Sequence, residues 1–407
     1  MAKLSSSNGL EKRPKLRFPG FDEPYKQCRI GDIYAERSQR GASNMELLSV
    51  TMNDGVKPRS EIEGKDNSSE DKSNYKIVRK GDMVYNSMRM WQGANGISPC
   101  DGIVSPAYTV LMPKQEINNG YFAALFKSAN LINEFRKNSQ GMTSDTWNLK
   151  YPQIETIKIQ IPSVSEQDKV SELFGVLDAR IVAQAQLIEA LKKYKRGSLS
   201  ALFPKKGEIT PQYRFAGFTK PWEQRKLGEL PEKTYGGGTP STTNVEYWNG
   251  NIPWLQSSNI AEGKLFDVTP KKFISQSGLN SSAAQLIPEN SIAIITRVGV
   301  GKLAFLPFSY TTSQDFLSMS RLTTEPYFTV YACYKKLQSE LNSVQGTSIK
   351  GITKNELLAK EIKVPSYEEQ KQIGEYFANL DRLITLHQHK YDTLLSLKNA
   401  ILQQMFI

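Results

Sequence analysis

One domain-sized stretch occurs twice in the chain, and this duplication limits the possible folds more than any other feature. Residues 14–27 read PKLRFPGFDEPYKQ and residues 211–224 read PQYRFAGFTKPWEQ, an offset of 197. The closing motifs IPSVSEQ at 161–167 and VPSYEEQ at 364–370 have an offset of 203. A period of about 200 residues is too long for a solenoid or propeller repeat, so we infer duplication of a whole domain. Matching ends predict that the two copies share one structural role. Differing middles predict that each copy recognises something different.

Each closing motif leads into a long helical stretch. The patterns Ser163–Glu166 and Ser366–Glu369 follow a proline and predict S-x-x-E capping boxes at the two helix starts. Steps of four and three residues then form a heptad seam, which is typical of a coiled coil. The apolar and polar seam positions are Val170, Phe174, Leu177, Ile181, Gln184, Ile188, Leu191, Lys195, Ser198 and Leu202, and in the second copy Ile373, Phe377, Leu380, Ile384, His387, Tyr391, Leu394, Lys398, Ile401 and Met405.

We expect the two helices to pack against each other as an antiparallel coiled coil. A helix of about 40 residues is about 60 Å long. The polar seam positions coincide in the two copies, since Gln184 matches His387 and Lys195 matches Lys398. Such residues usually fix register or partner choice at a cost in stability. The alternative is that each helix packs only on its own domain.

The middles mix short β-like runs with amphipathic helices, so the predicted fold class is α+β. Residues 77–85 and 286–295 read as strand–turn–strand, and residues 121–137 and 327–344 read as helices. We predict two mixed α/β domains in a tandem pseudo-twofold arrangement, joined by the two long helices. The expected boundaries are a polar leader at 1–13, a first domain at 14–160, a first helix at 161–206, a second domain at 207–361 and a second helix at 362–407.

The charge of the chain indicates an anionic partner. The net charge is +11 with a pI near 9.2, and without a basic amphipathic anchor this favours nucleic acid over membrane. No apolar run is long enough for a membrane span or a signal peptide. Cys28, Cys100 and Cys333 lack CxxC spacing, which argues against disulfides and structural zinc and suits a reducing cytoplasm.

The side chains needed for catalysis are largely absent. His387 and His389 are the only histidines and lie inside the second helix, which argues against a histidine-based catalytic or metal site. Residues 299–302 resemble part of a phosphate loop, but Thr296 and Leu303 stand where glycine and Ser/Thr are needed. Residues 236–240 read as a flexible glycine-rich loop, which we place close to a phosphate as a hypothesis. We therefore expect no enzyme activity, no metal and no cofactor on this chain.

The two end motifs resemble the conserved regions of the specificity subunit of Type I restriction–modification systems. Arg17–Phe21 and Arg214–Phe218 resemble the segments that open each half of that family, and the two Pro-Ser-x-x-Glu-Gln motifs resemble those that close each half. The resemblance implies that each domain recognises one half of a bipartite double-stranded DNA target, while the coiled coil sets the gap between the halves. It implies two methyltransferase subunits and two restriction/translocase subunits as partners. S-adenosylmethionine and ATP with Mg are then expected on those partners, in a bacterial cytoplasm.

Candidate DNA contacts are basic, amide and hydroxyl residues at turn-rich tips, although a solvated surface side chain is an equally good reading for any one of them. The tryptophans at 91, 147, 248 and 254 are expected to pack in the core or in loops rather than to stack on bases. The candidates are Lys57, Arg59, Arg79, Lys80, Tyr85, Asn86, Ser87, Arg89, Thr143 and Ser144 in the first domain, and Lys271, Lys272, Thr296, Arg297, Lys302, Thr347, Ser348 and Lys350 in the second.

Two other readings of the chain remain. One is a coiled-coil structural adaptor whose basic domains bind DNA without sequence preference. The other is a degenerate recognition subunit that survives as a reservoir of specificities. An unrecognised nuclease ranks last, because the inventory of acids and bases is poor.

Overall fold

The computed structural model describes residues 14–41, 44–52, 55–205, 207–343 and 351–406. The chain forms two compact units, and each takes residues from both long helices. The first unit contains the residues up to Gln186 together with those from His389 onward, and the second contains Leu187–Gln388. Each unit therefore contains one mixed domain and parts of both long helices. These parts are the first half of the helix that follows the domain in sequence and the last part of the other long helix.

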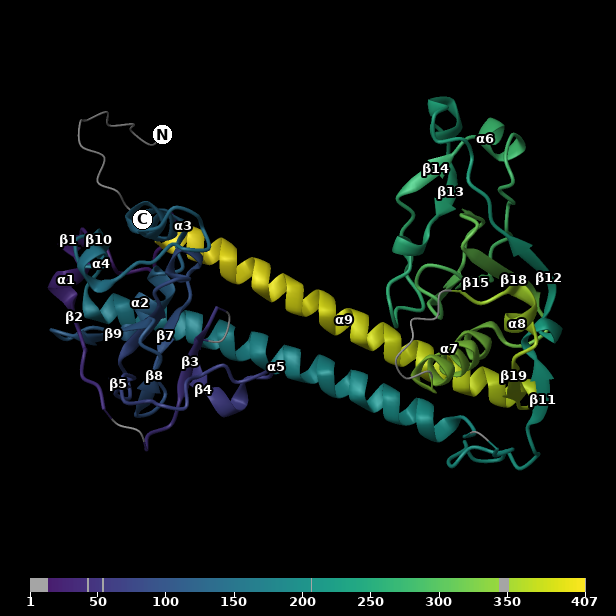
Figure 1. Ribbon diagram of the computed structural model, residues 1–407, viewed down its shortest axis with the longest axis horizontal. Coiled ribbons are helices and arrows are strands. Elements are labelled where there is room, and N and C mark those ends of the chain that lie inside the picture. The colour runs from purple at the N-terminus through teal and green to yellow at the C-terminus, as the bar shows by residue number, and fades with distance from the viewer. Residues whose placement is uncertain (1–13, 42–43, 53–54, 206, 344–350, 407) are drawn as a thin grey trace. The chain divides into compact units, whose positions relative to one another are not determined.

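The first unit is built on a four-stranded antiparallel sheet in the order β2-β9-β6-β7 (Figure 1). Three two-stranded ladders and four short helices surround it. The sheet consists of β2 (Tyr34–Glu36), β9 (Tyr108–Pro113), β6 (Met83–Asn86) and β7 (Asn95–Ile97). The ladders pair β1 (Lys26–Arg29) with β10 (Lys158–Ile161), β3 (Leu48–Thr51) with β4 (Gly55–Pro58), and β5 (Lys76–Val78) with β8 (Gly102–Val104). The helices are α1 (Ile30–Ile33), α2 (Asn119–Leu125), α3 (Ala129–Asn138) and α4 (Tyr151–Ile154).

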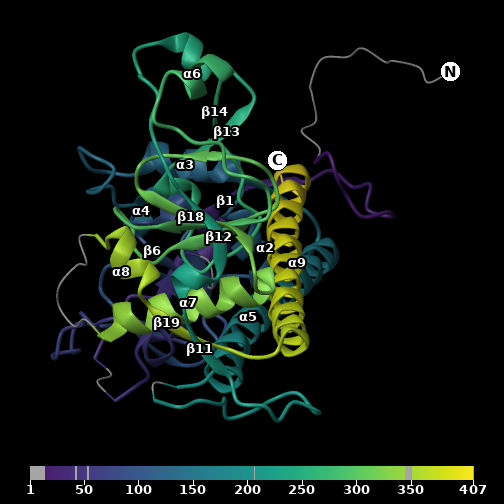
Figure 2. The same ribbon diagram turned by 90° about the vertical axis from the view of Figure 1, so that its right-hand side faces the viewer.

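The second unit repeats the four-stranded sheet in the order β12-β18-β15-β16. A lobe with β13, β14 and α6 extends beyond this sheet in both views (Figure 1, Figure 2). The main sheet consists of β12 (Pro231–Gly236), β18 (Phe316–Leu322), β15 (Ser291–Ile295) and β16 (Leu303–Leu306), and β11 (Glu223–Lys226) pairs with β19 (Glu361–Val364). The other elements are β14 (Lys272–Ile274), β13 (Ile252–Leu255), β17 (Thr311–Thr312), α6 (Gln276–Asn280), α7 (Pro326–Ser343) and α8 (Lys354–Leu358).

The long helices are α5 (Val164–Leu202) and α9 (Tyr367–Met405), each of 39 residues. Both start where the sequence predicts, directly after the Pro-Ser dipeptides. In α5 the seam side chains from Val170 to Ile188 are buried. In α9 the seam is buried at Ile373 and Phe377, whereas the seam positions between Leu380 and Leu394 are only partly buried.

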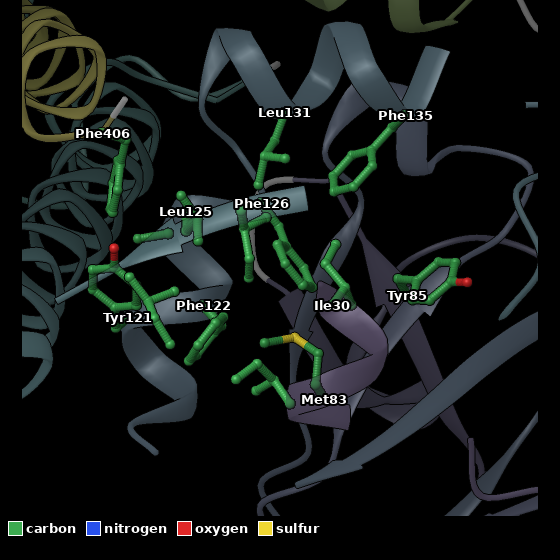
Figure 3. Packing of buried hydrophobic residues seen from close by; sticks show 14 of the residues in the cluster. Ile30, Met83, Tyr85, Tyr121, Phe122, Leu125, Phe126, Leu131, Phe135 and Phe406 are labelled. Carbon is green, nitrogen blue, oxygen red and sulfur yellow. The ribbon is translucent and has the colours of Figure 1, made fainter. Parts of the chain in front are cut away.

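The core of the first unit joins α2 and α3 to the two long helices (Figure 3). Phe122, Phe126 and Phe135 pack edge to face at centroid distances of 5.5–6.3 Å. Phe406, at the end of α9, stacks on Phe174 at 5.9 Å and meets the ring of Tyr121 at 5.4 Å. The last residues of the chain therefore complete the core of the first domain.

An equivalent phenylalanine completes the core of the second unit. Phe203, which is 203 residues before Phe406, packs against Phe328 at 5.5 Å and Phe377 at 6.0 Å. Phe377 is likewise 203 residues after Phe174. The duplication is therefore preserved in the aromatic packing, and in each unit the phenylalanine that closes the core follows the long helix of the other copy.

Two local predictions about the middles are wrong. The helix expected over 121–137 is two helices, because the Ser128 hydroxyl accepts a hydrogen bond from Leu131 N and starts α3 as a new helix. The glycine-rich segment 236–240 is a loop from Gly237 on, as predicted, but it is closely packed instead of flexible. A Cβ on Gly237 would lie 1.9 Å from the Ser313 carbonyl oxygen and one on Gly238 would lie 2.3 Å from Ala283, so these glycines permit close backbone packing.

Residues 296–302 form the hairpin tip between β15 and β16, with Gly299 and Gly301 in left-handed conformations. Within the described residues no group of His, Cys, Asp or Glu side chains is placed to hold a metal ion. No helix in that part of the chain combines the length and apolarity needed to cross a bilayer.

Candidate nucleic-acid interface and its supporting frame

In the first unit, the opening motif is tied to the start of α5 by a buried ion pair. Arg17 donates from Nε and Nη2 to the two carboxylate oxygens of Glu166, at 2.8 and 2.7 Å. The Tyr25 hydroxyl donates to the same carboxylate at 3.1 Å. Only 1% of the Glu166 side chain is exposed. The hydrogen bond to Glu166 raises the pKa of Arg17, so the guanidinium stays charged.

The second unit contains the same ion pair. Arg214 binds Glu369 through Nε and Nη2 at 2.8 and 2.6 Å. The predicted capping boxes are therefore wrong in their detail, because both glutamates bind arginines instead of the backbone at the helix start. This bidentate geometry is the strongest form of arginine–carboxylate contact.

The glutamine that follows each glutamate joins the long helix to the middle of its domain. Gln167 accepts from Asn118 N at 3.0 Å and donates to the Pro162 carbonyl at 3.0 Å. Gln370 accepts from Glu325 N at 2.9 Å and donates to the Pro365 carbonyl at 2.8 Å. Because the middle is held through a backbone N–H, its side chains are free to differ between the copies.

The opening motif also closes the end of the other copy's long helix. Leu16 N donates to the Gln404 carbonyl at 2.9 Å, and Tyr213 N donates to the Ala201 carbonyl at 3.0 Å. The last carbonyls of a helix have no partner within the helix, so each contact satisfies one of them. Each opening motif thus joins the start of one long helix to the end of the other.

Within each unit the two long helices run antiparallel and share an ion pair. In the second unit Lys195 binds Asp381 at 2.5 Å, and in the first unit Lys398 binds Asp178. The lysines are 203 residues apart, and so are the aspartates. The seam lysines are therefore paired across the helices. The heptad seam does not include these aspartates. The Leu-Asp dipeptide that recurs at 177–178 and 380–381 identifies them in the sequence.

Three candidate DNA contacts are buried, and their prediction needs correction. Tyr85 is fully buried in β6, where Met83 and Val84 are also fully buried, so both faces of this strand are covered. The Ser87 hydroxyl shares a buried hydrogen bond with Thr109, and the Thr296 hydroxyl donates to the Asp315 carbonyl. All three side chains are buried, and the hydroxyls of Ser87 and Thr296 already have partners within the protein.

Other candidates have partners within the first domain, although Arg79 is itself exposed. Arg59 donates to the carbonyls of Ile62, Gly64 and Lys65, and Arg79 pairs with Asp101 at 2.7 Å. Asn86 accepts from Met88 N, and Lys57 is half-buried and takes part in a polar interaction. These side chains shape the tips of the first domain.

The remaining candidates are accessible. Lys80, Arg89, Thr143, Ser144, Lys271, Lys272 and Arg297 are exposed, and Lys302, the last residue of the 296–302 hairpin tip, is half-buried. Thr347, Ser348 and Lys350 lie outside the described residues. Trp91 packs on Trp147, and Trp248 packs on Trp254.

The lobe of the second unit has a basic pocket of about 430 Å³ lined by Trp248, Lys271, Lys272 and Phe273. The Lys272 ammonium lies 5.6 and 5.7 Å from the ring centroids of Trp248 and Trp254. This pocket and the hairpin tip at Arg297 are two exposed basic sites of the second domain. Such surfaces suit phosphate contacts.

Comparison with known proteins agrees with the duplicated architecture. A family model described as Type I restriction modification DNA specificity domain matches residues 23–193 and 219–396. The specificity subunit of the Type I restriction enzyme EcoR124I/EcoR124II from Escherichia coli is 28% identical over 230 residues, 54% of this chain and 52% of that protein. The Type I restriction enzyme MjaIX specificity subunit from Methanocaldococcus jannaschii is 26% identical over 197 residues, 46% of this chain and 44% of that protein. The chain thus spans about half the length of these two curated relatives.

A solved structure shows the same fold over almost the whole chain. The S subunit of a Type-I restriction-modification system from M. genitalium has a TM-score of 0.60 and 13% sequence identity. The match covers 97% of this chain and 99% of that chain. The likeness extends across both domains and both long helices.

Proposed function

Because the chain belongs to the Type I restriction modification DNA specificity family, we propose that it is the sequence-recognition subunit of such a system. Each mixed domain recognises one half of a bipartite DNA target, and the two helices set the distance between the halves. The chain transfers no methyl group and cuts no DNA. S-adenosylmethionine and ATP with Mg belong to methyltransferase and restriction/translocase subunits, two of each, that assemble on this frame.

The observation that carries this proposal is the repeated frame. The Arg17–Glu166 and Arg214–Glu369 pairs, the glutamine bridges and the helix-end contacts recur in both units. A frame that recurs in both units offers equivalent docking surfaces to two copies of one partner. The middles differ in the exposed side chains that meet base edges, and such side chains determine sequence preference.

Exchange of one middle should change one half of the target. Residues 35–158 replaced by the matching segment of a relative keep Arg17, Tyr25, Glu166 and Gln167, so the frame should persist. We expect the methylated motif of a strain carrying the exchange to change in one half-site only, as read by single-molecule methylome sequencing. The matched control exchanges residues 231–360 and should change the other half. Changes in both halves from one exchange would refute the modular assignment, and unchanged halves would favour the non-specific adaptor.

Substitution of Arg297 tests the hairpin tip. In the assembled methyltransferase complex, Arg297→Ala should weaken DNA binding and reduce the slope of log K against log salt by about one if the guanidinium contacts a phosphate. The control is Lys192→Ala, which removes an exposed cation of α5 that pairs with Glu189. Equal affinity and equal salt slope for Arg297→Ala and the unsubstituted chain would remove this hairpin from the interface.

A further inference from the structure

A tyrosine of the second unit fills the space beside the helix–helix ion pair. Tyr331 in α7 is fully buried, and its hydroxyl donates to Asp381 Oδ2 at 2.6 Å. The Lys195 ammonium lies 5.3 Å from the centroid of the Tyr331 ring, and Phe377 packs on the same ring at 5.1 Å. The Tyr331 phenol therefore contacts a hydrogen-bond acceptor, a cation and an aromatic ring.

The first unit has alanine at the matching position. Gln167 and Gln370 bind the backbone N–H groups of Asn118 and Glu325, which aligns α2 with α7 at an offset of 207. Tyr121 and Phe328 keep this offset, and both meet the phenylalanine that closes their unit. At the same offset, Ala124 corresponds to Tyr331.

A pocket of about 280 Å³ lies where the ring would be. Its lining includes Phe174, Asp178 and Lys398, the counterparts of the three residues that hold the Tyr331 ring, as well as Ala124. The space thus shares three neighbours with the phenol of the second unit, and Lys127 also lines it. An apolar cavity of roughly 150 Å³ is sufficient to bind benzene.

The carboxylate beside this pocket has room for a donor. Asp178 Oδ1 accepts from Lys398, as Asp381 Oδ1 accepts from Lys195. In the second unit Oδ2 accepts from the Tyr331 hydroxyl, whereas no donor to Asp178 Oδ2 occurs among the residues that the structure describes. About half of the Asp178 side chain is exposed, at 53%, so a ligand reaches it from solvent.

We propose that this pocket is a binding site for a phenol. The ring packs on Phe174 beside the Lys398 ammonium, which adds cation–π attraction, and the hydroxyl donates to Asp178 Oδ2. The ligand is a phenolic small molecule or a tyrosine side chain, which share this chemistry. The inference rests on the internal duplication alone and does not depend on the DNA-recognition function.

Titration of the full chain with p-cresol, the side-chain analogue of tyrosine, tests the site by calorimetry and NMR. We expect saturable binding of one equivalent, and toluene should bind roughly tenfold more weakly because it lacks the hydroxyl that binds the carboxylate. Ala124→Tyr should abolish p-cresol binding and raise the thermal midpoint. Asp178→Ala, at a half-exposed position, should reduce p-cresol affinity to that of toluene.

Tyr331→Ala is the matched gain-of-site variant, because it should open a second p-cresol site in the second unit. N-acetyltyrosinamide distinguishes a tyrosine side chain from a free phenolic small molecule as the ligand. Its binding supports a tyrosine of another protein, and binding of p-cresol alone supports a free small molecule. Absence of saturable p-cresol binding overturns the proposal, as does binding that survives Ala124→Tyr or that toluene matches.

Discussion

Arg214→Ala should lower the free energy of unfolding of the second unit by about 3–5 kcal/mol, because it leaves a buried carboxylate without its partner. Glu369 has 1% of its side chain exposed and accepts two hydrogen bonds from Arg214. Its carboxylate would then be desolvated without compensation. Hydrogen exchange measured in increasing urea should show faster opening of β11, β19 and the start of α9, with little change in the first unit.

Two variants separate this effect from simple loss of charge. Arg214→Met combined with Glu369→Leu removes both partners and should cost much less than Arg214→Ala, since no unpaired charge stays buried. Lys192→Ala breaks an exposed ion pair with Glu189 and should change stability by about 0.5 kcal/mol or less. A double variant as unstable as Arg214→Ala would contradict the assignment of the cost to the unpaired carboxylate.

Phe406→Ala should destabilise the first unit by about 3–5 kcal/mol through loss of buried ring contacts and creation of a cavity. Phe406 is 6% exposed and packs on Phe174 and Tyr121. The expected readout is faster hydrogen exchange in α2, α3 and the first half of α5. Protection in the sheet of the second unit should stay unchanged.

Phe203→Ala is the matched control in the other unit and should reverse the pattern, because Phe203 packs on Trp222, Phe328 and Phe377. Leu386→Ala provides a surface control in α9, since Leu386 is 63% exposed and should change stability by about 0.5 kcal/mol or less. Equal loss of protection in both units from either phenylalanine variant would show that the units do not open separately.

The sequence was most informative where structure is local. Helix starts at Val164 and Tyr367 follow from a proline, a serine and an apolar period, all within a few turns. The Arg17–Glu166 pair joins residues 149 positions apart, so no local pattern points to it. Comparison of the two copies does point to it, because arginine and glutamate recur at the same place in both end motifs.

Surface residues were predicted least well. The position of Tyr85 near turn residues predicts exposure, but β6 lies inside a sheet with both faces covered, which the short run of sequence does not reveal. The charge of Arg59 predicts a phosphate contact, although its guanidinium binds the carbonyls of its own loop. Charge and turn composition identify a tip, but the direction of each side chain depends on tertiary contacts.

The closure of the first unit by Phe406 has a consequence for synthesis on the ribosome. The second unit uses residues 187–388, which emerge without interruption, whereas the first unit needs its own early residues and those from 389 onward. At roughly 5–20 residues per second, the ribosome takes on the order of 10–40 s to make the intervening segment. During that time Tyr121 and Phe174 lack their aromatic neighbour. The domain that is made first is therefore the one that finishes folding last.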